Sequence, residues 1–135
     1  MVERLQTSQV VRRRMAMQAT RDTEPELLLR RVLHGRGLRY RLHRRPVDGL
    51  RRTADIVFSG RRLAVFVDGC FWHGCPEHGS LPKNNRSWWE AKLSANTLRD
   101  RETDEALRAV GWGVLRIWEH EDPEAAADRV VEQLR

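Results

Sequence analysis

The chain has few of the features that stabilise a small secreted protein or anchor a protein in a membrane. Only two of its 135 residues are cysteines, and no apolar run is long enough to span a bilayer. The N-terminus, Met1-Val2-Glu3-Arg4, lacks the apolar core of a secretory signal. We therefore expect a soluble cytoplasmic protein with one hydrophobic core. In that compartment, two cysteines are more often metal ligands or free thiols than a disulfide.

Lysine is also scarce, since only two of the 25 basic residues are lysines. Residues 1–62 contain 16 arginines and six acidic residues, a net charge of +10, whereas residues 63–135 have a net charge of −4. Guanidinium groups suit bidentate contact with phosphate, and a one-sided basic half is typical of nucleic-acid-binding proteins. An arginine-rich proteome would give the same composition, so charge alone leaves both interpretations open.

The hydrophobic pattern predicts a single compact α/β domain with a central mixed sheet flanked by helices. Thr23-Glu24-Pro25-Glu26 has the form of a capping box and predicts a helix that ends near Gly35 and Gly37. We expect four strands, at residues 38–43, 54–58, 63–67 and 112–118. Two further helices are expected, at about 87–110 and after 123. Residues 20–135 would form this domain, and the arginine-containing residues 1–19 an N-terminal arm.

The most informative segment runs from Val67 to His78 and contains both cysteines. Its spacing is Cys70-x4-Cys75-x2-His78, and His120 follows a distant strand. Structural zinc sites use four Cys or His ligands, so these residues predict a zinc site if the two strands are neighbours. A pair of ordinary buried thiols is the alternative. The lack of C-x-x-C spacing disfavours a redox pair.

Two carboxylates are expected to meet at one edge of the sheet. Asp55 begins one strand and Asp68 ends the next, so a hairpin would bring them together. Carboxylates bind Mg²⁺ together with substrate phosphate oxygens. This arrangement resembles the PD-(D/E)xK core of restriction-endonuclease-like folds, although the expected lysine is missing and His73 is available in its place. Glu26 has two interpretations, as a catalytic acid and as the capping-box partner of Thr23.

Further motifs extend over residues 12 to 120. They are Met15-x-Met17-x4-Asp22-Thr23-x-Pro25-Glu26, Asp55-Ile56-Val57-Phe58, Phe66-Val67-Asp68-Gly69-Cys70-Phe71-Trp72-His73, Cys75-Pro76-x-His78, Asn84-x-Arg86-x2-Trp89, Lys92-x3-Asn96-x3-Asp100 and Gly111-Trp112-x-Val114-x3-Trp118-Glu119-His120. In these motifs and their order the chain resembles the very short patch repair (Vsr-type) DNA mismatch endonucleases. Some members of that family carry a histidine at the position of Asp68.

The resemblance implies a Mg²⁺-dependent nick in one strand of double-stranded DNA next to a T·G mismatch, which arises by deamination of 5-methylcytosine. It implies that Asp55 and the backbone carbonyl of Val67 bind Mg²⁺. His73 would act as general base or acid, Glu26 would assist through metal-bound water, and Asp100 would orient the histidine. A related nuclease without mismatch preference and a non-catalytic, zinc-braced mismatch-binding module are the alternatives.

The same resemblance implies the DNA contacts and the setting. Phe71, Trp72 and Trp89 would form an aromatic wedge that enters the base stack. Met15, Arg12 and Arg14 would contact DNA from the arm. A nucleoid-associated monomer would suffice for a single nick, and candidate partners are mismatch-repair proteins and a cytosine-5 methyltransferase system.

Overall fold

The structure, a computed structural model, describes residues 22–70, 72, 73, 75 and 81–135. The N-terminal arm expected at residues 1–19 lies outside this range. The described elements are α2 (Glu24–Gly35), β1 (Arg41–Arg44), β2 (Ala54–Phe58), η1 (Ser59–Arg61), β3 (Leu63–Asp68), α3 (Arg86–Ala109), β4 (Gly113–Trp118) and α4 (Pro123–Leu134). This order confirms the predicted α-β-β-β-α-β-α arrangement.

The four strands form one mixed sheet in the order β1-β2-β3-β4. β1, β2 and β3 are successive antiparallel neighbours, whereas β4 pairs with β3 in parallel. A parallel neighbour requires a crossover connection, and α3 supplies it. The register places Val67 opposite Ile117 and Asp68 opposite Trp118, so β3 and β4 end together. The segments that follow them in the sequence therefore begin at the same edge.

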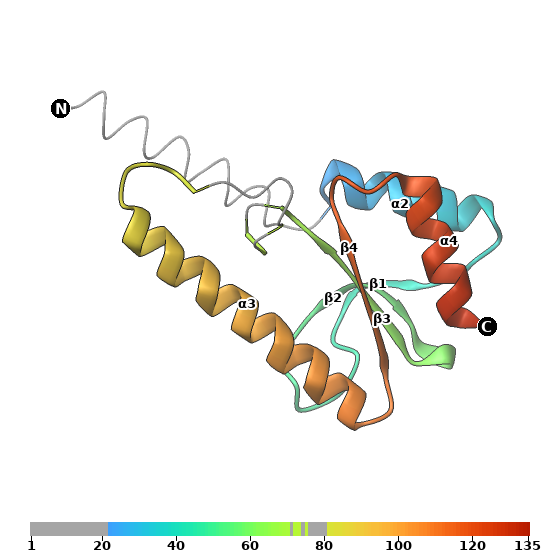
Figure 1. Cartoon of the computed structure of the whole chain (residues 1–135). Coiled ribbons are helices and arrows are strands. Elements are labelled where there is room, and N and C mark those ends of the chain that lie inside the picture. The colour runs from blue at the N-terminus through green and yellow to red at the C-terminus, as the bar shows by residue number, and fades with distance from the viewer. Residues whose placement is uncertain (1–21, 71, 74, 76–80) are drawn as a thin grey trace.

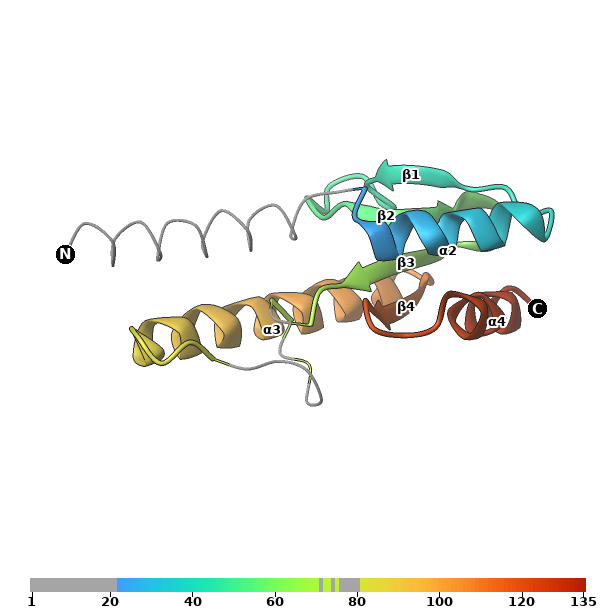
Figure 2. The same ribbon diagram turned by 90° about the horizontal axis from the view of Figure 1, so that it is seen from above.

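Helices cover both faces of the sheet. Figure 1 shows α3 on one side and α2 with α4 on the other, and Figure 2 shows the same layers from above. On the α2/α4 face, the buried core includes Leu29, Leu33, Ile56, Val65 and Val130. On the α3 face, a smaller core contains Ala54, Val57, Ala64, Phe66 and Leu107. The central strands β2 and β3 are thus buried on both faces, which explains their continuous apolar sequences.

The start of α2 differs from the predicted capping box. Thr23 occupies the N-cap position with extended backbone, but its side chain makes no capping hydrogen bond. The Glu26 side chain instead contacts Arg30 and His43, and only 2% of its surface is exposed. The capping-box interpretation of Glu26 is therefore wrong for this structure. Glu26 thus pairs with Arg30 and His43 instead of forming the reciprocal capping hydrogen bond with Thr23.

Other boundaries shift by a few residues. β1 begins at Arg41 rather than at Leu38. The hairpin turn between β2 and β3 is a short 3-10 helix, after which Arg62 adopts a left-handed backbone with φ of 51°. In α4, the Asp122 side chain accepts a hydrogen bond from the backbone N–H of Ala125, a regular N-cap. Among the described residues, no helix combines the length and apolar character needed to cross a membrane.

Candidate active site and metal centre

A pocket of about 210 Å³ opens where β2 begins and β3 ends. Its lining includes Glu26 from α2, Asp55 from β2, Asp68 from β3 and Asp100 from α3. His73, from the segment after β3, also lines it. Four carboxylates and an imidazole from five parts of the chain therefore meet in one cavity. Every residue proposed from the sequence for acid–base or Mg²⁺ chemistry lies here.

Asp55 links two strands at the floor of this pocket. The backbone N–H of Val67 donates a hydrogen bond to Oδ2 of Asp55 at 2.7 Å. Burial raises the pKa of Asp55 to about 7; the Val67 hydrogen bond opposes this shift, and the neighbouring carboxyl of Glu26 adds to it. A buried carboxylate pressed against a second carboxyl is stabilised by a bound cation. The donor chemistry therefore fits a hard divalent ion.

Glu26 is held beside Asp55 by two basic side chains. Arg30 Nη1 lies 2.8 Å from Oε2 of Glu26, and Nε2 of His43 lies 3.2 Å from the same oxygen. Both basic side chains also contact Asp22. The sequence gives no indication of a role for His43, yet its side chain is only 10% exposed. His43 has a φ of 50°, an uncommon backbone for a non-glycine residue, and this is the conformation in which its ring meets Glu26.

His73 lies between two carboxylates. Its Nδ1 is 2.5 Å from Oδ2 of Asp100, and its Nε2 is 3.8 Å from Oδ1 of Asp68. Burial disfavours the imidazolium, but the Asp100 hydrogen bond and the charge of Asp68 outweigh burial and leave the pKa of His73 raised. The structure thus brings Asp100 to His73 in the pairing that the resemblance implies. Asp68, whose role the sequence left open, becomes the second neighbour of this ring.

Sequence reasoning missed Arg116, which lies behind His73. Its guanidinium contacts Asp68 and Asp104 at 3.1 and 2.8 Å, and it lies 4.2 Å from the centroid of the Phe66 ring. Burial raises the pKa of Asp68, and the charges of His73 and Arg116 oppose that shift. The available signal was a single arginine inside the otherwise apolar strand 112–118. Such a residue is expected to have a buried ionic partner.

The second cluster contains both cysteines and His120. Sγ of Cys70 and Sγ of Cys75 lie 3.1 and 3.8 Å from Nδ1 of His120. Among the described residues neither cysteine forms a disulfide, and both side chains are buried. The parallel pairing of β3 with β4 brings His120 to this position, as the sequence predicted. The fourth expected ligand, His78, lies outside the described residues.

The environment of these thiols favours a cation. Burial raises the pKa of Cys70 to about 12, and neighbouring Cys75 adds to the rise. A bound metal ion deprotonates thiols that would otherwise stay neutral. Two sulfur atoms and an imidazole nitrogen, each within 4.8 Å of the others, are donors that zinc prefers. A hydrogen bond also fixes the start of this segment, because the backbone N–H of Cys70 donates to Oε1 of Glu119 at 3.0 Å.

The expected aromatic wedge divides into an accessible and a buried part. Trp72 is half-buried, and the Asn96 side chain donates to its backbone carbonyl at 3.3 Å. Trp89 is only 6% exposed, with its ring 6.1 Å from that of Trp72 and 4.7 Å from that of Trp88. Trp88, at 51% exposed, is the outward member of the pair. In this structure Trp89 supports the other two rings, and its surface is covered.

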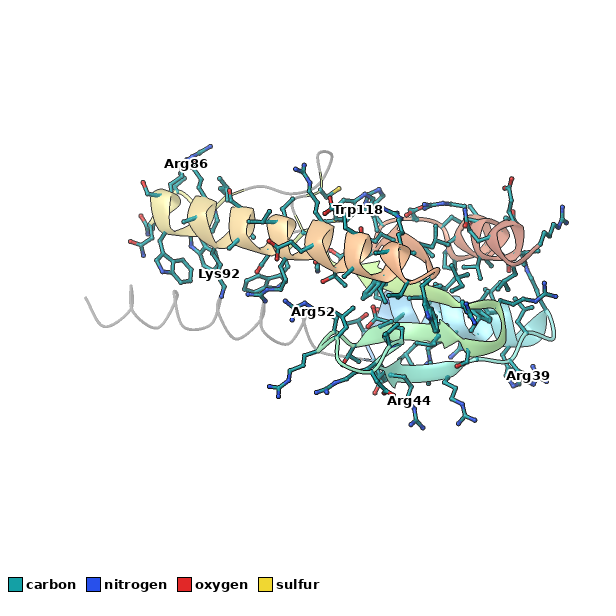
Figure 3. The ribbon with its side chains drawn as sticks, turned by 90° about the horizontal axis from the view of Figure 1, so that it is seen from below. Arg39, Arg44, Arg52, Arg86, Lys92 and Trp118 are labelled. Carbon is teal, nitrogen blue, oxygen red and sulfur yellow. The ribbon has the colours of Figure 1, made fainter. Side chains whose placement is uncertain are left out.

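Several proposed DNA contacts cannot be placed. Phe71 of the wedge lies outside the described residues, as do Met15, Arg12 and Arg14 of the arm. Other arginines are visible. Figure 3 shows Arg39 and Arg44 projecting from the β1 side of the sheet, and Arg52 between the sheet and α3. Within the described ranges, Arg41 and Arg44 form no ion pair, so their charges are available to an anionic partner.

Taken together, the pocket and the neighbouring cysteine cluster offer three chemical capacities. Asp55 and Glu26 can hold a divalent cation. An imidazole fixed by Asp100, with its pKa raised, can accept and donate a proton. The cysteine cluster can hold a second, structural metal in the segment that carries His73. This combination suits hydrolysis of a phosphodiester, which requires charge neutralisation and proton transfer.

Known proteins share this sequence over most of its length. A family model described as "DNA mismatch endonuclease Vsr" matches residues 5–77. The chain is 48% identical over 122 residues to the type II nicking enzyme V.NaeI of Lentzea aerocolonigenes, covering 87% of this chain and 74% of that protein. It is 47% identical over 114 residues to the type II nicking enzyme V.XorIIP of Xanthomonas oryzae, with coverages of 82% and 81%.

A third relative carries the family name itself. The DNA mismatch endonuclease Vsr of Escherichia coli K12 is 36% identical over 104 residues, which are 75% of this chain and 64% of that protein. The family match includes Glu26, Asp55 and His73, and so covers the part of the pocket formed before α3. The chain therefore belongs to the Vsr family of DNA mismatch endonucleases, which are DNA-cleaving hydrolases.

Proposed function

We propose that this endonuclease nicks one strand of double-stranded DNA next to a T·G mismatch and so starts very short patch repair. The observation that carries the proposal is the convergence of Glu26, Asp55, His73 and Asp100 in one pocket of a Vsr-family chain. The reaction is hydrolysis of one phosphodiester. Water forms a new bond to phosphorus, the bond to the leaving oxygen breaks, and that oxygen takes up a proton.

Asp55 and the backbone carbonyl of Val67 would hold Mg²⁺ at the pocket floor. The fit rests on the raised pKa of buried Asp55 and on the adjoining carboxyl of Glu26, which together leave excess negative charge for a cation to offset. When bound, Mg²⁺ neutralises phosphate charge and lowers the pKa of water. Glu26, fixed by Arg30 and His43, would orient a water molecule by accepting its hydrogen bond.

His73 would move the proton that hydrolysis requires. The hydrogen bond between Nδ1 and Asp100 directs the other ring nitrogen, Nε2, away from Asp100 and towards Asp68 at the pocket wall. From there Nε2 can accept a proton from the attacking water or donate one to the leaving oxygen. Asp100 would fix the ring orientation and stabilise its charged form, as a carboxylate does for a catalytic histidine.

Zn²⁺ would be structural and would be bound by Cys70, Cys75, His120 and His78. The first three supply a compatible donor set in the described residues. Their role would be to fix the segment that carries Trp72 and His73, since its described residues belong to no helix or strand. The zinc cluster would thereby hold both the DNA-facing ring and the proton-transfer group in register with the pocket.

DNA recognition would combine arginines and aromatic rings. Phe71 and Trp72 would enter the base stack, supported by Trp89 beneath them. Opening a mispaired step costs less than opening a paired one, so insertion favours a mismatch. Arg12, Arg14 and Met15 of the arm would contact the duplex. A monomer suffices for one nick, and mismatch-repair proteins and a cytosine-5 methyltransferase system are proposed partners in the nucleoid.

The proposal is tested by nicking of end-labelled duplexes that differ only at one base pair, T·G against C·G. Each duplex is labelled on one strand at a time and placed in a panel of flanking sequences with Mg²⁺ present. We expect a single nick in the T-containing strand. Equal cleavage of both duplexes would replace the proposal with a nuclease lacking mismatch preference. Binding of T·G duplexes without any cleavage would indicate a non-catalytic module.

A further inference from the structure

Arg116 is an arginine inside a strand that faces the α3 core. It lies in the middle of β4, opposite Phe66 in the register with β3. Its guanidinium carbon is 4.2 Å from the Phe66 ring centroid, and its side chain is 20% exposed. Burying a guanidinium is costly unless its donors are all paired. The partners of the Arg116 guanidinium therefore show which side chains it holds in place.

The guanidinium contacts three carboxylates, those of Asp68, Asp100 and Asp104. Nη1 donates to both oxygens of Asp68, at 3.1 and 3.2 Å. Nε donates to both oxygens of Asp104, at 2.9 and 3.1 Å. Nη1 also lies 3.6 Å from Oδ1 of Asp100, and Nη2 donates to the backbone carbonyl of Asp100 at 3.4 Å. One side chain thus connects the end of β3 to two successive turns of α3.

Two of these three acids are the ones that flank His73. Asp100 lies 2.5 Å from Nδ1 of the ring, and Asp68 lies 3.8 Å from Nε2. Asp68 is 4% exposed, so it cannot turn outward to be solvated. Without the guanidinium, Asp68, Asp100 and Asp104 would repel one another in a space with little water. Asp100, at 23% side-chain exposure against 17% for Asp104, is the most exposed of the three acids, and it is the one bonded to His73.

We propose that Arg116 is a positioning residue of the active site, and that Asp68 is its buried counter-charge rather than a metal ligand. Arg116 holds Asp68 and Asp100 on the two sides of the His73 ring and so fixes the direction of Nε2. The planar fork of arginine is required, because lysine supplies one point charge and cannot reach Asp68 and Asp104 at once. This role rests on the proposed function, in which His73 transfers a proton.

The test compares three variants with wild type: Arg116→Met, Arg116→Lys and the double variant Arg116→Met/Asp68→Asn. Arg108→Met, an exposed arginine at the far end of α3, is the matched control. Single-turnover nicking of the T·G duplex at saturating DNA gives the chemical rate, and titration of DNA gives the affinity. We expect Arg116→Met to lose about 100-fold in rate with unchanged DNA affinity, since positioned acid–base groups contribute about that much.

The double variant separates positioning from simple loss of packing. Arg116→Met alone leaves the buried carboxylate of Asp68 without its counter-charge, and Asp68→Asn removes that unpaired charge. The double variant should therefore nick at least tenfold faster than Arg116→Met alone. Arg116→Lys should fold normally yet recover only part of the rate. The proposal is overturned if Arg116→Lys nicks like wild type, if the loss lies wholly in DNA affinity, or if the double variant is no faster than the single one.

Nuclear magnetic resonance of ¹⁵N-histidine-labelled protein gives a readout independent of cleavage. The Nδ1–H proton of His73, identified by its loss in His73→Gln, should be visible in wild type and in Arg108→Met and absent in Arg116→Lys. Persistence of this signal in Arg116→Lys would overturn the proposal even if activity fell. If wild type cleaves no duplex, the proposed function fails, whereas the resonance still decides whether Arg116 positions the ring.

Discussion

Asp55 on β2 accepts a hydrogen bond from the backbone N–H of Val67 on β3, at 2.7 Å. This bond fixes the buried carboxylate of Asp55 against the end of β3, just before the segment that contains Cys70 and Cys75. The carbonyl of Val67, proposed as a second oxygen ligand, belongs to the same residue. The pocket floor is therefore formed by the sheet itself, and the Asp55 side chain does not depend on a loop for its position.

Substitution of Asp55 should separate activity from stability. Asp55→Asn is expected to reduce nicking by at least about 1000-fold, because removal of a metal-binding carboxylate removes most of the charge stabilisation. The melting temperature should not fall, since asparagine keeps an acceptor for Val67 and removes repulsion with Glu26. Asp48→Asn, an exposed acid in the preceding loop, is the control. Activity near wild type in Asp55→Asn would exclude Asp55 as a ligand.

The affinity for Mg²⁺ should depend on pH. Burial and Glu26 raise the pKa of Asp55 to about 7, so below that pH a proton occupies the oxygen that the cation needs. Affinity should rise by about tenfold from pH 6 to pH 8 and level off above pH 8. Mg²⁺ titrations of nicking rate at fixed saturating DNA, at four pH values, measure this. An affinity that is flat from pH 6 to pH 8 would contradict the assignment.

Metal removal should unfold part of the structure. Purified protein is expected to contain about one equivalent of zinc, and a chelator should lower its melting temperature sharply. His120→Ala should lose the metal, because Nδ1 of His120 faces both thiols. His34→Ala, which changes an exposed histidine on α2, should keep it. Full folding in chelator with no bound zinc would show that Cys70 and Cys75 are ordinary buried thiols.

His43 should matter for catalysis although the sequence gives no hint of it. We expect His43→Ala to lower the nicking rate by about 10- to 100-fold, the usual effect of losing a side chain that orients a metal-site group. His43→Gln should recover part of this loss, because its amide can still donate to Glu26. The same His34→Ala variant controls for loss of a histidine. Unchanged rates in His43→Ala would mean that Arg30 alone positions Glu26.

The two adjacent tryptophans of α3 should behave differently. Trp89→Ala should cost about 3 kcal/mol in the free energy of unfolding, because it empties a buried site under Trp72. Trp88→Ala, at an exposed site, should change that free energy by less than about 0.5 kcal/mol. Denaturant unfolding of both variants checks this. A stable Trp89→Ala variant that fails to distinguish mismatched DNA would instead support direct insertion of this ring.

The order of elements could be predicted because each strand and helix has a distinct hydrophobic period. The position of His120 could also be predicted, since two parallel strands that end together bring their following residues together. These inferences depend on local pattern and on simple sheet geometry. They required no knowledge of side-chain directions.

The ionic contacts of the pocket could not be predicted in the same way. The partners of Arg116 come from β3 and α3, and those of His43 come from α2 and from Asp22 just before it, so they depend on how whole elements pack. Trp88 and Trp89 are identical in type, and only the packing of α3 decides which ring is covered. Glu26 matched a local capping motif, but tertiary contacts with Arg30 and His43 override that motif.

Strand-resolved nicking of paired duplexes is the most direct test of mismatch repair by this endonuclease. Two duplexes identical except for T·G or C·G at one position are incubated with wild type and with Asp55→Asn under single-turnover conditions with Mg²⁺. We expect wild type to cut only the T-containing strand, at least 100-fold faster than the matched duplex, consistent with the cost of opening a paired step, and Asp55→Asn to cut neither. Equal rates on the two duplexes, or cleavage by Asp55→Asn, would contradict it.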